Sequence, residues 1–299
     1  MAFEQSGCFM KKKIGLALGG GGARGLCHIE FIKVLDELGL KPSVISGTSI
    51  GSIVGAFYAS GFTGQQMEDL LNEIGLREIT KLVDPSFFSI AGLVKGKGIL
   101  EFLKEVLPIH AFDKLKIPLK VVATDYWQQK EVILYKGDLI QAIRASISIP
   151  AVFEPVTVDG QVLIDGGVTN PVPYDIIRNQ CDLLIAIDVN GAPLLPKKVR
   201  LPNMFENILS TVQILQNAIV VNKMSIAKPD LYYKPSLQNV GLLEFEKYDK
   251  VIESAAEDVE RFRGDMTVWK SENQKFRTYL KKRISGLYPK QEKSKEARP

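Results

Sequence analysis

Near its N-terminus the sequence alternates strand-like and helix-like segments in an order that commits the chain to a parallel β-sheet. The apolar run Ile14–Leu18 ends in a glycine-rich turn, after which apolar residues recur at helical spacing as far as Leu38. Gly39 and Pro42 end that helix, and residues 44–46 begin a second strand. Because a strand–helix–strand unit packs back onto its own sheet, the two strands are predicted to be adjacent and parallel.

The second strand runs into the sequence Gly-Thr-Ser-Ile-Gly at residues 47–51, and the small and apolar residues after it predict a helix. Ser49 therefore falls on a strand-to-helix turn, where a nucleophile elbow places its serine. A turn this sharp strains the serine backbone, and side chains at positions 47 and 51 would crowd the strand against the helix. Gly-x-Ser-x-Gly alone is a weak pattern, so a turn that only caps a buried helix is the alternative.

The turn after the first strand has three interpretations, which depend on Gly20, Gly21, Gly22, Arg24 and Gly25. Its glycine spacing fits a dinucleotide-binding fingerprint, but the next strand does not end in the acidic side chain that would hold a ribose. The loop is not a phosphate-binding P-loop either, because no Lys-Ser/Thr pair follows the glycines. An oxyanion hole is the second interpretation, with glycine N–H groups converging and Arg24 adding positive charge. A tight turn without a ligand is the third. Since the two turns follow adjacent parallel strands, we expect both to open into one crevice.

Composition indicates a globular protein and argues against several kinds of site. With 45% apolar and 24% charged residues, the 299-residue chain can bury a sizeable core. It has no apolar run of the roughly 18 residues that a transmembrane helix needs, and no cleaved signal peptide is expected. The three cysteines lack metal-ligand spacing and favour reduced thiols in a cytoplasm, and there are only two histidines. We therefore predict no metal and no cofactor.

The net charge of +4 is concentrated at the C-terminus. From Lys270 onward the chain has ten Lys or Arg against three Asp or Glu, so this segment carries +7 and the rest carries −3. The body is therefore not expected to bind nucleic acid. The segment also has an apolar stripe at helical spacing beside a basic cluster, made of Trp269, Phe276, Leu280, Ile284 and Leu287 and of Lys281, Lys282 and Arg283. The stripe either packs on the body or on a second subunit, which we favour, or lies in a membrane interface.

The middle of the chain continues the alternation of strands and helices. Hydrophobic periodicity predicts helices at residues 65–79, 99–107, 140–147, 207–226 and 248–262, and strands at 119–124, 132–135, 156–158, 162–164, 183–188 and 231–233. The helix at 207–226 is expected to be amphipathic, the strand at 231–233 to lie at an edge, and a further helix to open near Pro173. Residues 85–98 mix aromatics, glycines and lysines, and we expect a surface loop rather than a flap that meets lipid.

Asp165 is the candidate proton acceptor for Ser49. It ends the second strand of a hairpin predicted around Asp159-Gly160, and two glycines follow it. Nucleophile-elbow hydrolases carry a histidine after the acid, whereas His28 and His110 both precede Asp165. We interpret both histidines as structural, because a lone histidine is usually a satisfied scaffold residue. A carboxylate can act on the serine directly if burial raises its pKa.

Three motifs in this order resemble those of the bacterial patatin-like phospholipases, serine acyl hydrolases with a Ser-Asp dyad. They are Gly-Gly-Gly-Ala-Arg-Gly at 20–25, Gly-Thr-Ser-Ile-Gly at 47–51 and Asp-Gly-Gly at 165–167, accompanied by Ser-Ile-Ser-Ile-Pro at 146–150. The resemblance covers about residues 13–264 and implies a three-layer α/β/α sandwich with a mostly parallel central sheet. It also implies roles: Ser49 as nucleophile, Asp165 as general base, and Gly20, Gly21, Gly22 and Arg24 as the oxyanion hole.

We therefore predict a lipid acyl hydrolase that cleaves carboxylic esters of phospholipids, lysophospholipids or related acyl esters through an acyl-Ser49 intermediate. The expected organisation is a leader at 1–12, the hydrolase domain at 13–264, and a basic helix with a disordered tail at 265–299. The expected location is the cytoplasm, with peripheral membrane contact through the basic segment as an open alternative. An acyltransferase on the same site and a non-catalytic lipid-binding regulatory protein are the rival functions. No oligomeric state follows from the sequence.

Overall fold

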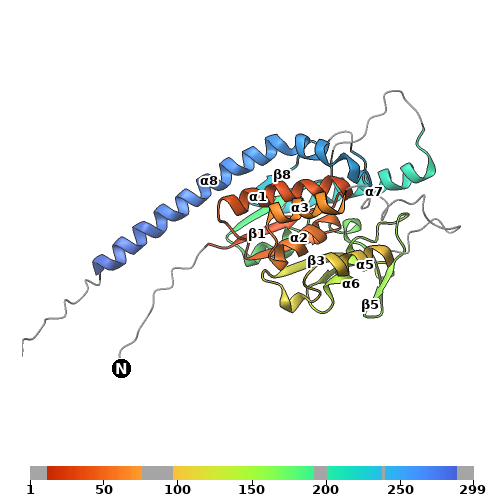
Figure 1. The fold of residues 1–299 in the computed structure, drawn as a ribbon, viewed down its shortest axis with the longest axis horizontal. Helices are drawn as coiled ribbons and strands as arrows, with labels where there is room; N and C mark the ends of the chain where they lie inside the picture. The colour runs from red at the N-terminus through yellow and green to blue at the C-terminus, as the bar shows by residue number, and fades with distance from the viewer. Residues whose placement is uncertain (1–11, 76–96, 192–200, 238–239, 288–299) are drawn as a thin grey trace, which may run out of the picture.

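The computed structural model describes residues 12–75, 97–191, 201–237 and 240–287 (Figure 1). Within them an eight-stranded sheet has the order β5-β6-β3-β2-β1-β7-β8, with β4 paired to β3. Neighbouring strands are parallel for β1 (Ile14–Leu18), β2 (Val44–Thr48), β3 (Leu119–Asp125), β7 (Leu183–Ile187) and β8 (Leu231–Tyr233). The antiparallel pairs are made by β4 (Lys130–Leu134), β5 (Val156–Val158) and β6 (Gln161–Asp165). The sheet is mostly parallel, as predicted, and β8 is an edge strand.

Helices cover this sheet unequally on its two faces. Alternate residues of β1 show the division, because Leu16 and Leu18 belong to the main core and Ala17 to a smaller core on the other face. The main core is covered by α1 (His28–Glu37), α2 (Ile50–Ser60), α3 (Gly64–Ile74), α5 (Lys97–Val106), α6 (Leu139–Ser146) and α8 (Tyr248–Leu287). The smaller core lies under the 3-10 helix η5 (Asp175–Gln180) and α7 (Met204–Ile226). These layers confirm the predicted α/β/α sandwich.

Local sequence explains most element boundaries, but several differ from expectation. The Asp159-Gly160 hairpin is confirmed, with φ angles of 48° and 79° at its two turn residues. The first helix begins as a 3-10 turn, η1 (Gly22–Cys27), before α1 starts. The segment after Pro173 forms the 3-10 helix η5 and not the α-helix we predicted near it. Prolines at 171 and 173 lack N–H donors and Cys181 is already extended, which leaves room only for a short helix.

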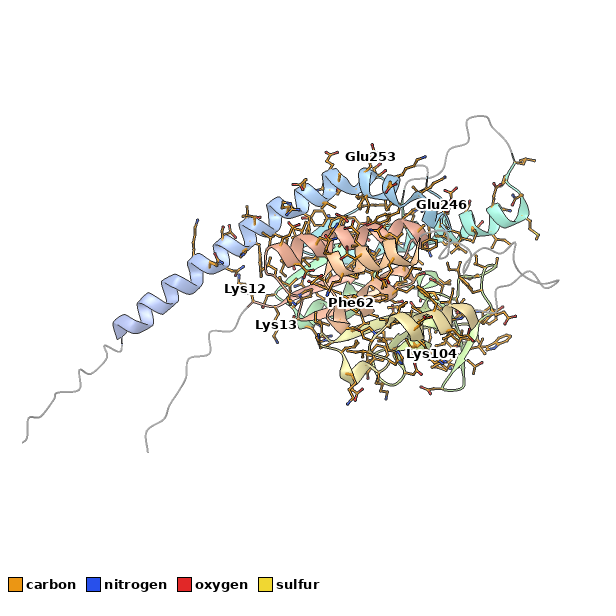
Figure 2. The ribbon with its side chains drawn as sticks, in the orientation of Figure 1. Lys12, Lys13, Phe62, Lys104, Glu246 and Glu253 are labelled. Atoms are coloured by element: carbon orange, nitrogen blue, oxygen red, sulfur yellow. The ribbon has the colours of Figure 1, made fainter. Side chains whose placement is uncertain are left out.

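Helix α8 is one continuous helix of 40 residues and does not end at 262. Its first half packs on the main core through Val251, Ala255, Val259, Phe262 and Met266, which recur at helical spacing and are buried. Glu253 lies on the opposite, solvent-facing side (Figure 2). The second half runs past the body (Figure 1). The expected domain boundary after residue 264 therefore falls inside a helix.

Helix α7 confirms a long helix at residues 207–226, but its apolar residues are divided between the interior and the solvent. Val220 is buried in the smaller core, whereas Met204, Ile214, Leu215 and Val221 are exposed. The polar side chains of Glu206, Gln213 and Gln216 line a cavity together with Leu209 and Val212. The inner face of α7 is therefore apolar only in part, unlike the face that amphipathic helices usually turn toward a core.

None of the helices in the described ranges is long and apolar enough to cross a membrane. Three predicted segments lie outside the described residues. They are the leader apart from Lys12, most of residues 85–98, and the tail at 289–299.

Candidate active site

Ser49 occupies the turn between β2 and α2 in a conformation that side chains rarely adopt. Its φ is 53° and its ψ is −125°, and only 6% of its surface is exposed. A Cβ at position 47 would lie 2.4 Å from the Gly51 carbonyl oxygen, and one at position 51 would lie 2.1 Å from the Leu18 carbonyl oxygen. Both flanking glycines are therefore required by the close approach of strand and helix. Since Ser49 is also the N-cap of α2, the positive end of the helix dipole lies at this serine.

The sheet brings Asp165 to Ser49 from 116 residues away in the sequence. Thr48 pairs with Val122 of β3, and the next residue of β3, Ala123, pairs with Asp165 of β6. The hydroxyl of Thr124 donates to the Asp165 carbonyl oxygen at 2.9 Å. Ser49 thus follows the end of β2 and Asp165 ends β6, and only β3 lies between these two strands in the sheet.

The Asp165 carboxyl group is buried and only half satisfied. Its Oδ1 accepts a hydrogen bond from Gly167 N–H at 2.6 Å, whereas its buried Oδ2 has no hydrogen-bond partner among the described residues. Burial raises the pKa of Asp165 to about 6, and the nearby Ser49 hydroxyl and Gly167 N–H oppose that rise. The hydroxyl faces the carboxyl group without a hydrogen bond of ordinary geometry. A carboxylate of this pKa can accept a proton near neutral pH.

The glycine loop borders Ser49, and its N–H groups have different uses. A Cβ on Gly20 would lie 3.3 Å from Ser49 Cβ, but Gly20 N–H already donates to the Pro171 carbonyl oxygen at 2.9 Å. The N–H groups of Gly21 and Gly22 donate to no group in the described part of the chain. Gly22 has a φ of 58°, and a Cβ there would lie 2.0 Å from the Leu242 carbonyl oxygen. Of the three predicted oxyanion glycines, two therefore have a free N–H.

Arg24 is almost fully buried beside this loop, with 2% of its surface exposed. Its Nε donates to the Val240 carbonyl oxygen at 2.9 Å, and its buried Nη1 has no partner among the described residues. Burial lowers the pKa of its guanidinium, an effect that the charge of Glu244 opposes. Arg24 is thus placed both to hold the segment around Val240 and to add positive potential to the crevice.

Two cavities meet at Ser49. One, of about 130 Å³, is lined by apolar side chains of α2, α3 and α5, among them Ile53, Leu71 and Phe102. The other, of about 210 Å³, has a mostly apolar lining but is more polar than the first, and it is lined by Gly20, Gly21, Gly22, Arg24, Ser49, Asp165 and side chains of α7. The predicted site residues therefore share one crevice, as the order of the parallel strands indicated.

The histidines lie where scaffold residues are expected. His28 Nε2 is 2.9 Å from the Gly19 carbonyl oxygen and so carries the proton, and burial lowers the pKa of the ring to about 4. His28 thereby braces the start of the glycine loop. His110 Nε2 bonds the Leu107 carbonyl oxygen at 2.9 Å. Within the described residues no group of three His, Cys, Asp or Glu side chains is placed to hold a metal ion.

Sequence reasoning did not assign the groups that contact the backbone of Ser49 and Asp165. Ser49 N–H donates to Ser146 Oγ, and Asp165 N–H donates to the Ser148 carbonyl oxygen, each at 2.9 Å. The Ser-Ile-Ser-Ile-Pro block was visible in the sequence, but nothing local to it indicates these contacts.

The chain is similar to several known proteins. Residues 16–177 match the family model described as patatin-like phospholipase. An NTE family protein of Mycobacterium tuberculosis is 39% identical over 193 residues, which are 64% of this chain and 53% of the relative. Patatin-like phospholipase domain-containing protein 6 of Mus musculus is 29% identical, over 80% of this chain and 20% of its own. Lysophospholipase NTE1 of Kluyveromyces lactis is 27% identical, over 80% of this chain and 18% of its own. The chain thus spans about half the length of the Mycobacterium tuberculosis relative and about a fifth of the length of the other two.

Proposed function

Since the chain belongs to the patatin-like phospholipase family, we propose that it is a lipid acyl hydrolase that cleaves carboxylic esters of phospholipids or lysophospholipids. The observation that carries the proposal is the place of Ser49. It lies on a strained turn, faces a buried carboxyl group, and lines both an apolar cavity and a more polar one. An acyl chain fits the first cavity and the polar alcohol part of the ester fits the second. The name of the Kluyveromyces lactis relative supports lysophospholipids as substrates.

In the proposed reaction Ser49 and Asp165 act as a dyad. Ser49 Oγ attacks the carbonyl carbon of the ester while Asp165 Oδ2 takes the hydroxyl proton. The alcohol leaves with that proton, and the acyl group stays on Ser49 as an ester. Water then attacks the acyl carbon as Asp165 takes one of its protons, and Ser49 recovers a proton as the fatty acid departs.

The negative charge on the carbonyl oxygen needs donors that are fixed before the reaction. The N–H groups of Gly21 and Gly22 are available for this role, whereas the N–H of Gly20 holds the loop through Pro171. The N-terminus of α2 and the guanidinium of Arg24 add positive potential. We propose Gly21, Gly22 and Arg24 as the oxyanion site, with Gly20 as its support.

The test is a pair of single variants and their combination. Ser49→Ala and Asp165→Asn are each expected to abolish hydrolysis of lysophosphatidylcholine, and the double variant is expected to be no worse, because the two residues act as a unit. A serine-directed fluorophosphonate probe should label wild-type protein at Ser49, as located by peptide mass spectrometry, and should not label Ser49→Ala. His110→Ala is the control and should retain activity. Activity that survives in Asp165→Asn and is lost in folded His28→Ala would exclude the dyad.

A further inference from the structure

The turn that ends α6 spans only Ser146 to Ser148 and contacts the backbone of both residues of the proposed dyad. Ser146 is the last residue of α6, and its Oγ accepts the N–H of Ser49 at 2.9 Å. Two residues later, the Ser148 carbonyl oxygen accepts the N–H of Asp165 at 2.9 Å. Both serines are fully buried, with 0% of their surface exposed. Two strand ends that are 116 residues apart are therefore joined through one short turn.

Ser146 satisfies a buried N–H group that the helix itself cannot satisfy. Ser49 is the N-cap of α2, so its N–H precedes the helical hydrogen bonds. The Ser49 carbonyl oxygen, by contrast, accepts two hydrogen bonds, from the Ser52 N–H at 2.8 Å and from the Ser52 hydroxyl at 2.6 Å. Loss of the Ser52 hydroxyl would leave one of these two bonds, whereas loss of the Ser146 hydroxyl leaves the Ser49 N–H unpaired. The strained φ of 53° at Ser49 persists only if surrounding contacts fix it, and the contact that fixes the N–H of Ser49 is the Ser146 hydroxyl.

The rest of the turn is fixed by Arg144. Its Nη1 donates to Ser148 Oγ at 2.6 Å, and Ser148 Oγ donates to the Arg144 carbonyl oxygen at 2.9 Å. Arg144 Nη2 also donates to the Glu154 carbonyl oxygen, and its guanidinium lies over the Phe153 ring at 5.5 Å. Arg144 is 2% exposed. A turn held this firmly can set the position of the carbonyl group that holds Asp165.

We propose that Ser146 is a positioning residue for the nucleophile, and that the turn from Ser146 to Ser148 sets Ser49 against Asp165. Ser146 acts through the N–H of Ser49 and not on the substrate. The inference rests on the proposed hydrolase function, since it concerns how the same dyad is aligned. A displacement of about 1 Å at reacting groups can cost on the order of 10² in rate, so the loss of this contact should be visible in kcat.

The experiment compares Ser146→Ala with Ser46→Ala. Ser46 is equally buried, and its hydroxyl makes one hydrogen bond, to the Pro173 carbonyl oxygen at 2.7 Å, away from Ser49. Both variants should lose similar thermal stability. Only Ser146→Ala should lose roughly 10- to 100-fold in kcat on a short-chain p-nitrophenyl ester, with KM changed less than about threefold, and the same factor in the rate of fluorophosphonate labelling. Ser146→Thr keeps the hydroxyl and should recover most of the rate if it folds.

The pH profile separates positioning from a loosened site. If Ser146→Ala only misaligns Ser49, the acidic limb of activity does not move to lower pH, because the burial of Asp165 is unchanged and a weaker contact with the Ser49 hydroxyl can only raise the pKa of Asp165. A site opened to water would lower the pKa of Asp165 and move that limb to lower pH. A limb moved to lower pH, a kcat and labelling rate within twofold of wild type, or an equal loss in Ser46→Ala would each overturn the inference. A wild-type protein inert to the probe and to all esters would overturn the proposed function itself.

Discussion

The pKa of Asp165 decides the pH at which the proposed site can work. Burial raises it to about 6, and the base must be ionised to take a proton from Ser49. Ester hydrolysis is therefore expected to rise with pH through about 6 and to reach a plateau above it. At pH 5 about one tenth of the plateau rate should remain, because about one tenth of the carboxyl groups are ionised one unit below the pKa. A kcat/KM profile with a soluble ester measures this, and a limb near pH 4 would contradict the buried base.

The same residue is expected to lower the stability of the fold. Since its pKa is higher in the folded state than the ordinary value of 3.8, the folded state binds the proton more tightly, and stability falls as pH rises from about 4 to about 6. The cost is fully present above that window and amounts to at most about 3 kcal/mol. Asp165→Asn should therefore raise the unfolding free energy at pH 8 and have less effect at pH 4. Urea unfolding at both pH values checks the sign, and destabilisation at pH 8 would contradict it.

Arg24 combines a structural bond with a charge beside the crevice. Arg24→Ala removes the bond to the Val240 carbonyl oxygen and leaves a buried space, so a loss of about 2–4 kcal/mol in stability is expected. If Arg24 also stabilises the oxyanion, kcat should fall by roughly 10²- to 10³-fold in protein that is still folded. Thermal unfolding and kcat are to be measured on the same preparation. A wild-type rate with reduced stability would assign Arg24 to the structural bond alone.

At the scale of elements, α8 changes what a truncation experiment can mean. The contacts of this helix with the body extend beyond residue 264, since Met266 is fully buried, Trp269 packs on the main core, and Lys270 Nζ donates to the Leu38 carbonyl oxygen at 2.7 Å. Packing on the body therefore accounts for the first member of the predicted stripe. The stripe members from 276 onward remain a prediction from the sequence.

Two deletions separate the packed and the projecting parts of α8. Deletion of 266–299 should destabilise the protein, because a buried Met alone contributes about 2–5 kcal/mol. Deletion of 276–299 should keep the fold and the turnover of a soluble short-chain ester. If the basic segment binds membranes, as we hypothesise, this shorter deletion should lower activity on anionic vesicles in a salt-sensitive manner. The hypothesis would be dismissed if the full-length protein and the 276–299 deletion were equally active on anionic vesicles, and if neither distinguished anionic from neutral vesicles.

For the whole molecule, the two cavities at Ser49 predict selectivity for long acyl chains. Ile53 lies one turn beyond Ser49 on α2 and lines the apolar cavity of about 130 Å³. Ile53→Phe should narrow that cavity and lower kcat/KM for a C16 lysophosphatidylcholine at least roughly tenfold more than for a butyryl ester. Ile214→Phe, at an exposed position of α7, is the control. A similar loss on both substrates would mean that the acyl chain binds elsewhere.

The sequence by itself determined that the first two strands are adjacent and parallel, and it named both proposed catalytic residues. These follow from local rules: a helix between two strands makes them parallel, and the sharp turn at Ser49 needs glycine at 47 and 51 because any Cβ would meet a carbonyl oxygen. Asp165 could be named because no histidine follows it in the chain, and the Asp159-Gly160 turn placed it at a strand end.

Only the tertiary structure decided how these residues are used. The Gly20 N–H donates to the Pro171 carbonyl oxygen, the Ser49 N–H donates to Ser146 Oγ, and side chains of α7 line the crevice. Each of these contacts joins segments that lie far apart in the chain, and hydrogen-bond partners at such separations leave no local pattern. The mixed inner face of α7 and the length of α8 have the same cause, since a helix takes its inner face and its end from what it packs against.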